Sequence, residues 1–133
     1  MIVIDASILS KYLLQEPNWE EVKSYLSNSH SLDFVYIETA NAIWKDNLMN
    51  KKTNKDSLIK YKALKILVED VLVIHETKYV MEESFKIAIQ EKVPVYDILY
   101  IILSLTENMK LITADKNQAR IAEKYKVEVE MVR

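Results

Sequence analysis

The 133-residue chain contains no cysteine and no glycine. Without cysteine it has no disulfide framework, no thiolate metal site and no cysteine nucleophile, which fits a reducing cytoplasm. Without glycine it has no phosphate-cradling glycine loop, so a P-loop and a dinucleotide-binding fingerprint are excluded. Helix ends commonly use glycine at positive φ, and we expect asparagine to replace it at Asn28, Asn50 and Asn108.

Long apolar segments are also missing. The longest, Ile98 to Leu105, is interrupted by Tyr100 and Ser104 and is much shorter than the roughly 20 residues that a membrane span needs. The N-terminal segment has no basic region and no small-residue cleavage site, so we do not expect a signal peptide. Half of the residues are hydrophobic, enough for a core of its own. We therefore expect one domain over residues 1–133, cytoplasmic and without membrane contact.

Short apolar runs alternate with stretches of helical periodicity along the chain. The pattern predicts strands at residues 2–4, 32–35, 71–74, 111–113 and about 127–131. It predicts helices at residues 7–14, 18–26, 37–48, 55–68, 79–90 and 116–125, with one more that begins near residue 97. Such alternation favours right-handed crossovers and a parallel sheet. We expect an α/β three-layer sandwich, with a central parallel five-stranded sheet flanked by about seven helices.

Four acidic residues stand where an apolar run gives way to a helical pattern: Asp5, Glu38, Asp97 and Asp115. Because the carboxyl ends of parallel strands lie along one edge of a sheet, acids far apart in sequence would meet in one cleft there. Carboxylates packed together repel one another and take up protons unless a cation neutralises them. Oxygen-only ligands favour Mg²⁺ or Mn²⁺. The sequence therefore predicts a divalent-metal site.

Helix capping is the alternative for each aspartate taken alone, because Asp is a favoured N-cap residue and suits the positive end of the helix dipole. Glu38 is the exception, since Glu is not a preferred N-cap and this one lies among apolar neighbours. Ser7 and Thr113 each stand two residues from an aspartate, where a hydroxyl could bond the carboxylate or a metal-bound water. Local capping by these hydroxyls is equally compatible with the sequence.

Charge is unevenly distributed. The stretch from Lys45 to Lys65 holds seven lysines and two aspartates, a net charge of +5 in a chain of net charge −2. It is a candidate phosphate-contacting face, with Lys45, Lys51 and Lys52 as candidate substrate-binding residues. The alternative is an ordinary pair of solvated helices. Because the chain as a whole is mildly acidic, tight sequence-independent binding of nucleic acid would need a cation at the acidic cleft.

Other chemistry has less support. The only histidines are His30 and His75, and neither has an obvious carboxylate or nucleophile at a fixed spacing, which disfavours a histidine-based triad. The aromatic residues do not alternate with basic residues as they do in RNA-recognition motifs. Tyr96, beside Asp97, is the one aromatic residue that we place near a substrate, with core packing as its alternative.

These motifs together resemble the PIN-domain nucleases, and within them the VapC-type toxins of prokaryotic toxin–antitoxin pairs, over nearly the whole chain. The residues that carry the resemblance are Ile2-Val3-Ile4-Asp5-Ala6-Ser7, Glu38 with Asn41-Ala42, Tyr96-Asp97, and Leu111-Ile112-Thr113-Ala114-Asp115. Two departures stand out. Asn108-Met109-Lys110 fills the place of the family's usual glycine, and Asn117 stands where some relatives carry a further acid, which implies a weaker second metal.

The resemblance implies a metal-dependent endoribonuclease, the toxin of a toxin–antitoxin pair, that hydrolyses RNA and leaves 5′-phosphates. It implies that Asp5 and Asp97 are the principal ligands of Mg²⁺ or Mn²⁺ and that Asp115 serves a second ion. Glu38 would be a ligand or orient the attacking water, and Ser7 and Thr113 would support the quartet. A homodimer and an antitoxin that covers the acidic cleft are implied as well.

Two alternatives stay open at this point. The first is a nuclease of the same chemistry that serves RNA maturation or DNA repair, which carboxylates alone do not distinguish from a toxin. The second is a catalytically inactive PIN-like module that binds RNA or protein. The complete acidic quartet argues against the second.

Overall fold

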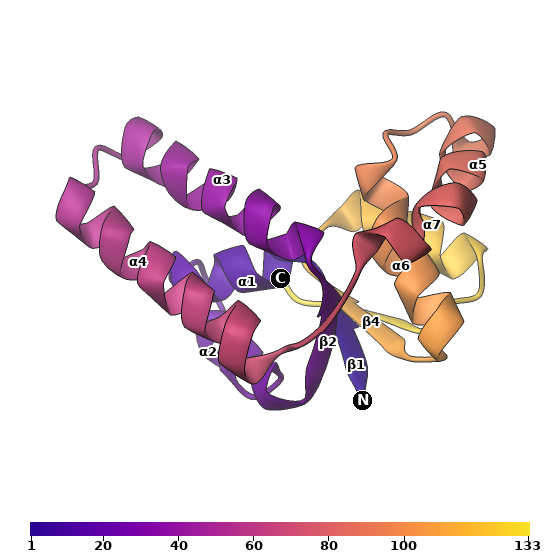
Figure 1. The fold of residues 1–133 in the computed structure, drawn as a ribbon, viewed down its shortest axis with the longest axis horizontal. Coiled ribbons are helices and arrows are strands. Elements are labelled where there is room, and N and C mark those ends of the chain that lie inside the picture. Colours follow the sequence, from indigo (N-terminus) through magenta and orange to yellow (C-terminus); the bar gives the residue numbers. More distant parts are fainter.

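All five strands of the computed structural model, which describes residues 1–133, lie in one parallel sheet (Figure 1). The strands are β1 (Ile2–Ile4), β2 (Ser29–Leu32), β3 (Val73–His75), β4 (Lys110–Thr113) and β5 (Val129–Met131). The helices are α1 (Ala6–Leu13), α2 (Trp19–Lys23), α3 (Phe34–Met49), α4 (Asn54–Ile66), α5 (Met81–Glu91), α6 (Tyr96–Glu107) and α7 (Lys116–Lys124). The predicted α/β fold, with a parallel five-stranded sheet and seven helices, is confirmed.

The strand order β3-β2-β1-β4-β5 places β1 at the centre of the sheet. The chain first builds outward from β1 to β3 and then crosses back to add β4 on the other side of β1. Such a reversal is a topological switch point, and ligands of open parallel sheets bind outside the carboxyl ends of the strands at that point. The switch lies between the carboxyl ends of β1 and β4, which Asp5 and Ala114 directly follow.

Helices cover both faces of the sheet. Right-handed crossovers put α1 to α4 on one face and α5 to α7 on the other, the two groups that Figure 1 shows on either side of the strands. The helix α6 is buried from Ile98 to Ser104 and packs on β1, β2 and β4. Its side chains belong to the same hydrophobic core as those of β1 and β4. This buried helix fixes the position of Asp97 at its start.

The helices α3 and α4 pack on each other as a hairpin that extends away from the sheet (Figure 1). Their outer surface carries large exposed apolar side chains: Trp44, Leu48, Met49, Leu58, Ile59 and Ile66. A second exposed apolar stripe follows one face of α5 through Met81, Phe85 and Ile89. No helix in the structure combines the length and the apolar character that crossing a membrane requires.

Residues other than glycine take all the left-handed positions in the chain. Positive φ occurs at Gln15, Asn18, Lys51, Lys92, Asn108 and Lys126. The prediction for Asn108 is confirmed, because it ends α6 with φ 54°. The predictions for Asn28 and Asn50 are wrong. A 3₁₀ turn at Leu26–Asn28 runs into β2 through extended Ser29, and after α3 the left-handed position falls one residue later, on Lys51.

The strand predicted at residues 32–35 is wrong in position, since β2 ends at Leu32 and α3 begins at Phe34. Polar residues form most of β2, yet they are buried, because the hydroxyl of Ser29 bonds the carbonyl of Tyr25 and the hydroxyl of Ser31 bonds that of Ile4. Hydrophobic periodicity does not detect a strand of this kind. As a consequence, α3 starts earlier than predicted and Glu38 lies in its second turn.

Candidate active site

Asp5 lies directly after β1, with its side chain 1% exposed. The hydroxyl of Ser7 donates to its Oδ1 and the hydroxyl of Thr113, from the neighbouring strand β4, donates to its Oδ2. Burial raises the pKa of Asp5 from 3.8 to about 6, although these hydrogen bonds act to lower it. Asp5 is therefore an oriented carboxylate that can take up a proton close to neutral pH.

Both hydroxyls predicted to support the acidic quartet bond the carboxylate of Asp5, which for Thr113 is not the aspartate nearest in sequence. Ser7 Oγ and Thr113 Oγ1 are 3.3 Å apart, so they meet across the β1–β4 switch point. Ser7 Oγ also accepts a hydrogen bond from the Ala114 amide at 2.8 Å, and Thr113 Oγ1 accepts one from the Asp115 amide at 3.0 Å. These contacts join the ends of the two central strands around one carboxylate.

Glu38 reaches the site from α3. Its Oε1 accepts a hydrogen bond from the hydroxyl of Tyr100, a fully buried residue of α6. Burial, together with the nearby charges of Asp5, Asp97 and Asp115, raises the pKa of Glu38 to about 7 against the opposing hydrogen bond from Tyr100. Burial and the proximity of Glu38 also raise the pKa of Tyr100, which keeps its proton on the hydroxyl. Sequence patterns do not reveal Tyr100, because it resembles one more apolar position of a buried helix.

Asp97 stands in the first turn of α6, and Asp115 precedes α7. Burial and then the charge of Asp115 raise the pKa of Asp97, while a hydrogen bond with the Asn117 side chain acts to lower it. Asp115 Oδ1 accepts the backbone amides of Asn117 at 2.8 Å and Gln118 at 3.1 Å. The side chain of Asn117 thus lies beside Asp97.

An aspartate of this site can cap a helix and also belong to the group of four acids. Asp5 and Asp115 each accept backbone amides of the helix that follows, so the capping alternative is correct for both. Asp97 and Glu38 lie inside their helices and cap nothing. The four acids nevertheless act on one another. Asp115 raises the pKa of Asp5 and of Asp97, and the other three acids all raise the pKa of Glu38. The structure therefore brings all four acids into one electrostatic neighbourhood at the carboxyl edge of the sheet.

The donor set fits a hard divalent cation, because it consists of carboxylate oxygens whose repulsion such an ion would relieve. In their present positions, however, no three His, Asp or Glu side chains form a group that could hold a metal ion. Protein donors hold three of the carboxylates: hydroxyls hold Asp5 and Glu38, and backbone amides hold Asp115. The assignment of metal ligands stays a prediction.

The three candidate substrate-binding lysines are exposed and lie along the α3–α4 hairpin. Lys45 is two helical turns beyond Glu38, about 10 Å along α3. It lines a hollow of about 280 Å³ together with Ser10 and Leu14 of the α1 region. Lys51 and Lys52 lie at the far end of the hairpin, away from the sheet (Figure 1). Glu38 and Lys45 thus lie on one side of α3, whereas the other two lysines are remote.

The structure also joins residues outside the acidic site. His30 Nδ1 lies 2.8 Å from His75 Nε2, and His75 Nδ1 lies 3.8 Å from the carboxylate of Glu107. Glu107 comes from another element, and sequence spacing does not reveal such partners. Glu107 ends α6 and Asp97 begins it, so this group lies about 15 Å along the helix from the acids. Tyr96 is 54% exposed and stacks on the ring of Phe34.

Comparison with known proteins shows the family to which this chain belongs. The PIN domain family matches residues 2–124, nearly the whole chain, and the protein belongs to that family. It is 28% identical to ribonuclease VapC3 of Pyrobaculum aerophilum over 134 residues, which is 93% of this chain and 94% of that protein.

Two solved structures share the fold. PAE2754 from Pyrobaculum aerophilum superposes with a TM-score of 0.72 at 19% identity, over 96% of this chain and 81% of that one. FitAcB from Neisseria gonorrhoeae superposes with a TM-score of 0.60 at 16% identity, over 97% of this chain and 96% of that one.

Proposed function

We propose that this PIN-domain protein is a metal-dependent endoribonuclease and the toxin of a type II toxin–antitoxin pair. One observation carries the proposal: four acids lie within electrostatic reach of one another at the carboxyl edge of the sheet, in a PIN domain that is similar along its length to a ribonuclease VapC. Burial and mutual repulsion raise the pKa of Asp5 to about 6 and that of Glu38 to about 7. Simultaneous ionisation of all four carboxylates is therefore unfavourable unless a cation balances their charge.

Asp5 and Asp97 would hold Mg²⁺ or Mn²⁺, with Asp115 and Glu38 completing the ligands of one or two ions. When bound, such an ion lowers the pKa of water to generate a nucleophile and offsets the charge that develops on the phosphate. Asn117 in place of a further acid leaves one negative charge fewer beside Asp97, which supports a weaker second site. The second site would sit next to α7.

The chain's own residues prepare the site. Ser7 and Thr113 fix both oxygens of Asp5, so that carboxylate needs little reorganisation to act as a ligand. If Glu38 is not a ligand but orients the attacking water, its pKa of about 7 suits it to accept that water's proton at neutral pH. Tyr100 orients Glu38 from the core and, by hydrogen bonding to its ionised form, keeps part of the population deprotonated.

Exposed apolar surface supports two protein partners. The α3–α4 hairpin presents a groove of about 410 Å³ lined by Ile43, Trp44, Leu58 and Tyr61. Because α3 also carries Glu38, an antitoxin bound along the hairpin would extend over the acids. The helix α5, with its exposed apolar stripe, lies on the opposite side of the sheet from this hairpin and suits a second copy of the chain.

Cleavage by an Asp97→Asn variant tests the proposal. We expect at least a 100-fold loss of Mn²⁺-dependent cleavage of structured RNA, with circular dichroism and melting close to those of the parent. Asp70→Asn, which neutralises an exposed acid in the helical turn after α4, is the matched control and should cleave normally.

Growth separates the toxin from a housekeeping nuclease. Expression of the parent chain should arrest growth, and co-expression of a DNA-binding protein encoded beside it should restore growth. Retained cleavage by Asp97→Asn would remove that residue from the mechanism. Cleavage without growth arrest would instead favour a role in RNA maturation or DNA repair.

A further inference from the structure

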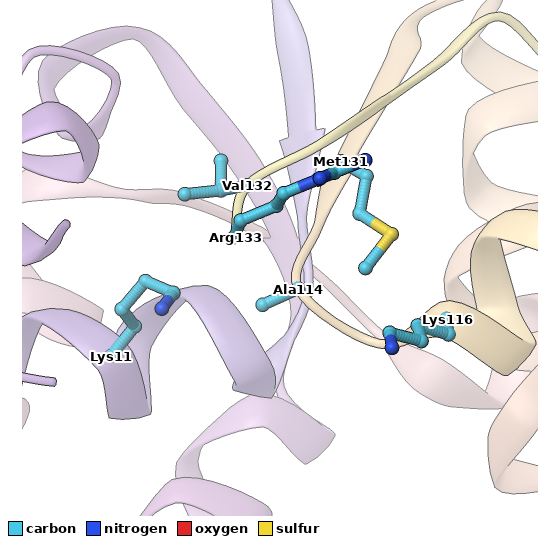
Figure 2. Close-up of a pocket in the computed structure, with 6 residues that line it drawn as sticks. All are labelled: Lys11, Ala114, Lys116, Met131, Val132 and Arg133. Atoms are coloured by element: carbon cyan, nitrogen blue, oxygen red, sulfur yellow. The ribbon is translucent and has the colours of Figure 1, made fainter. Parts of the chain in front are cut away.

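A cavity of about 610 Å³ opens beside the acidic site and is lined by cationic residues from three separate elements. Lys11 comes from α1, Lys116 opens α7, and Arg133 follows β5. Figure 2 shows Lys11 on one side of Ala114 and Lys116 on the other. The remaining lining residues, Met131 and Val132, have uncharged side chains.

None of these three cations forms an ion pair, although five other lysines or histidines of the chain do. The unpaired state is most unusual for Lys11, which is only 6% exposed. Its ammonium group donates to the carbonyl of Pro17 at 2.7 Å, a contact that satisfies one of its three N–H donors. Cationic side chains are therefore concentrated here without a carboxylate side chain to balance them.

The cavity shares its backbone with the acidic site. The amide of Ala114 donates to Ser7 Oγ, and Ser7 in turn bonds the carboxylate of Asp5. On the opposite wall, the amide of Val132 donates to the carbonyl of Thr113 at 2.9 Å, and the side chain of Thr113 also bonds Asp5. An anion in the cavity would lie next to the acids but outside their cluster.

We propose that this cavity binds a backbone phosphate of the RNA next to the one that is cleaved. The proposal rests on the RNA cleavage proposed above. An RNA strand that approaches four carboxylates meets repulsion, and three unpaired cations beside them supply a compensating attraction for a neighbouring phosphate. Arginine and lysine are the side chains that bind phosphate most strongly, and such contacts fix the register of the strand rather than its sequence.

The double variant Lys116→Ala/Arg133→Ala tests the site, since both residues are exposed and neither holds another part of the fold through its side chain. Lys23→Ala/Lys86→Ala removes two exposed, unpaired lysines from α2 and α5 and is the matched control. The dissociation constant of a fluorescent single-stranded RNA is measured in EDTA, so that no cleavage occurs, at several salt concentrations. For the double variant we expect binding about tenfold weaker than that of the parent. The slope of the logarithm of affinity against the logarithm of salt concentration should be smaller in magnitude by about 0.7, because one phosphate contact is lost. The dissociation constant of the control should change less than twofold.

Neutral methylphosphonate linkages, placed one at a time along the RNA, locate the contact. The parent should lose affinity most at one linkage beside the cleavage point, and the double variant should lose that sensitivity. Unchanged affinity in the double variant, or an equal response to every linkage, would overturn the proposal. Lys11→Met, checked by its melting temperature, should weaken binding in the same way if it still folds.

The two proposals fail in different ways. If the parent cleaves RNA with Mn²⁺ but the double variant binds RNA as the parent does, the phosphate site is wrong and the nuclease stands. If the parent cleaves no RNA while the double variant binds it about tenfold more weakly, the nuclease is wrong, and the cavity remains an RNA phosphate contact without a cleaved neighbour.

Discussion

The hydroxyl of Tyr100 donates a hydrogen bond to the carboxylate of Glu38, although 62 residues separate them in the chain. The two side chains belong to helices from opposite faces of the sheet, α6 and α3, which meet beyond its carboxyl edge. This contact links a buried core residue to the acid whose pKa is near 7. It connects the packing of the fold directly to the chemistry of the site.

Replacement of Tyr100 by Phe removes the donor and keeps the ring. Because the lost hydrogen bond stabilises ionised Glu38, the pKa of Glu38 should rise above its present value near 7, and cleavage at pH 7 should fall several-fold. In the pH–rate profile the acidic limb should move to higher pH. The free energy of unfolding of the variant should also fall by about 1 kcal/mol, because one hydrogen bond is lost. Tyr36→Phe, which loses an exposed hydroxyl pair with Tyr61, is the control. An unmoved limb would show that Tyr100 does not tune Glu38.

Stability of the metal-free protein should fall as pH rises from about 4 to 7. The pKa of Asp5 is about 6 in the fold against 3.8 in the unfolded chain, so the folded state holds the extra proton between these values. Stability is therefore greatest below the unfolded pKa and is lost as pH rises through the folded one, by roughly 2 to 3 kcal/mol for Asp5. Urea unfolding in EDTA at several pH values measures this. Asp5→Asn should be the more stable protein at pH 8, and equal pH slopes for the two proteins would contradict the prediction.

Added Mn²⁺ should reverse that loss. At pH 8 the ion should raise the melting temperature of the parent, because it binds the folded acids and not the unfolded chain. At 100 times its dissociation constant the gain is about 2.7 kcal/mol. The effect should shrink at pH 5.5, where protons compete for the same carboxylates, and it should be absent in Asp5→Asn. An equal rise for that variant would place the ion elsewhere.

Lys92→Gly should stabilise the protein by about 0.5 to 1 kcal/mol. Lys92 ends α5 in the left-handed region, with φ 59° and ψ 44°, where any residue with a Cβ is disfavoured. Lys86→Gly in the exposed middle of the same helix is the matched control and should destabilise by about 1 kcal/mol. Urea midpoints at one pH compare the two. A loss of stability in Lys92→Gly would mean that its side chain makes a contribution larger than the backbone strain.

Much of the site could be found from the sequence because its parts carry local signals. Asp5 and Asp115 follow short apolar strands and precede helical periodicity, and this arrangement alone identified their elements. Glu38 was selected because capping did not explain it, even though the start of its helix was placed three residues late. The strand β2 escaped detection because its buried serines are satisfied by backbone carbonyls, which hydrophobic patterns do not reveal.

The sequence by itself determined the alternation of strands and helices and the parallel sheet, and it singled out the four candidate acids, because each depends on local periodicity and on residue type. Only the tertiary structure decided which side chains meet. Tyr100 reaches Glu38, Thr113 reaches Asp5, and Arg133 joins Lys11 around one cavity because the crossovers bring distant segments to the same edge of the sheet. Such contacts depend on helix packing and strand order, which no local pattern encodes.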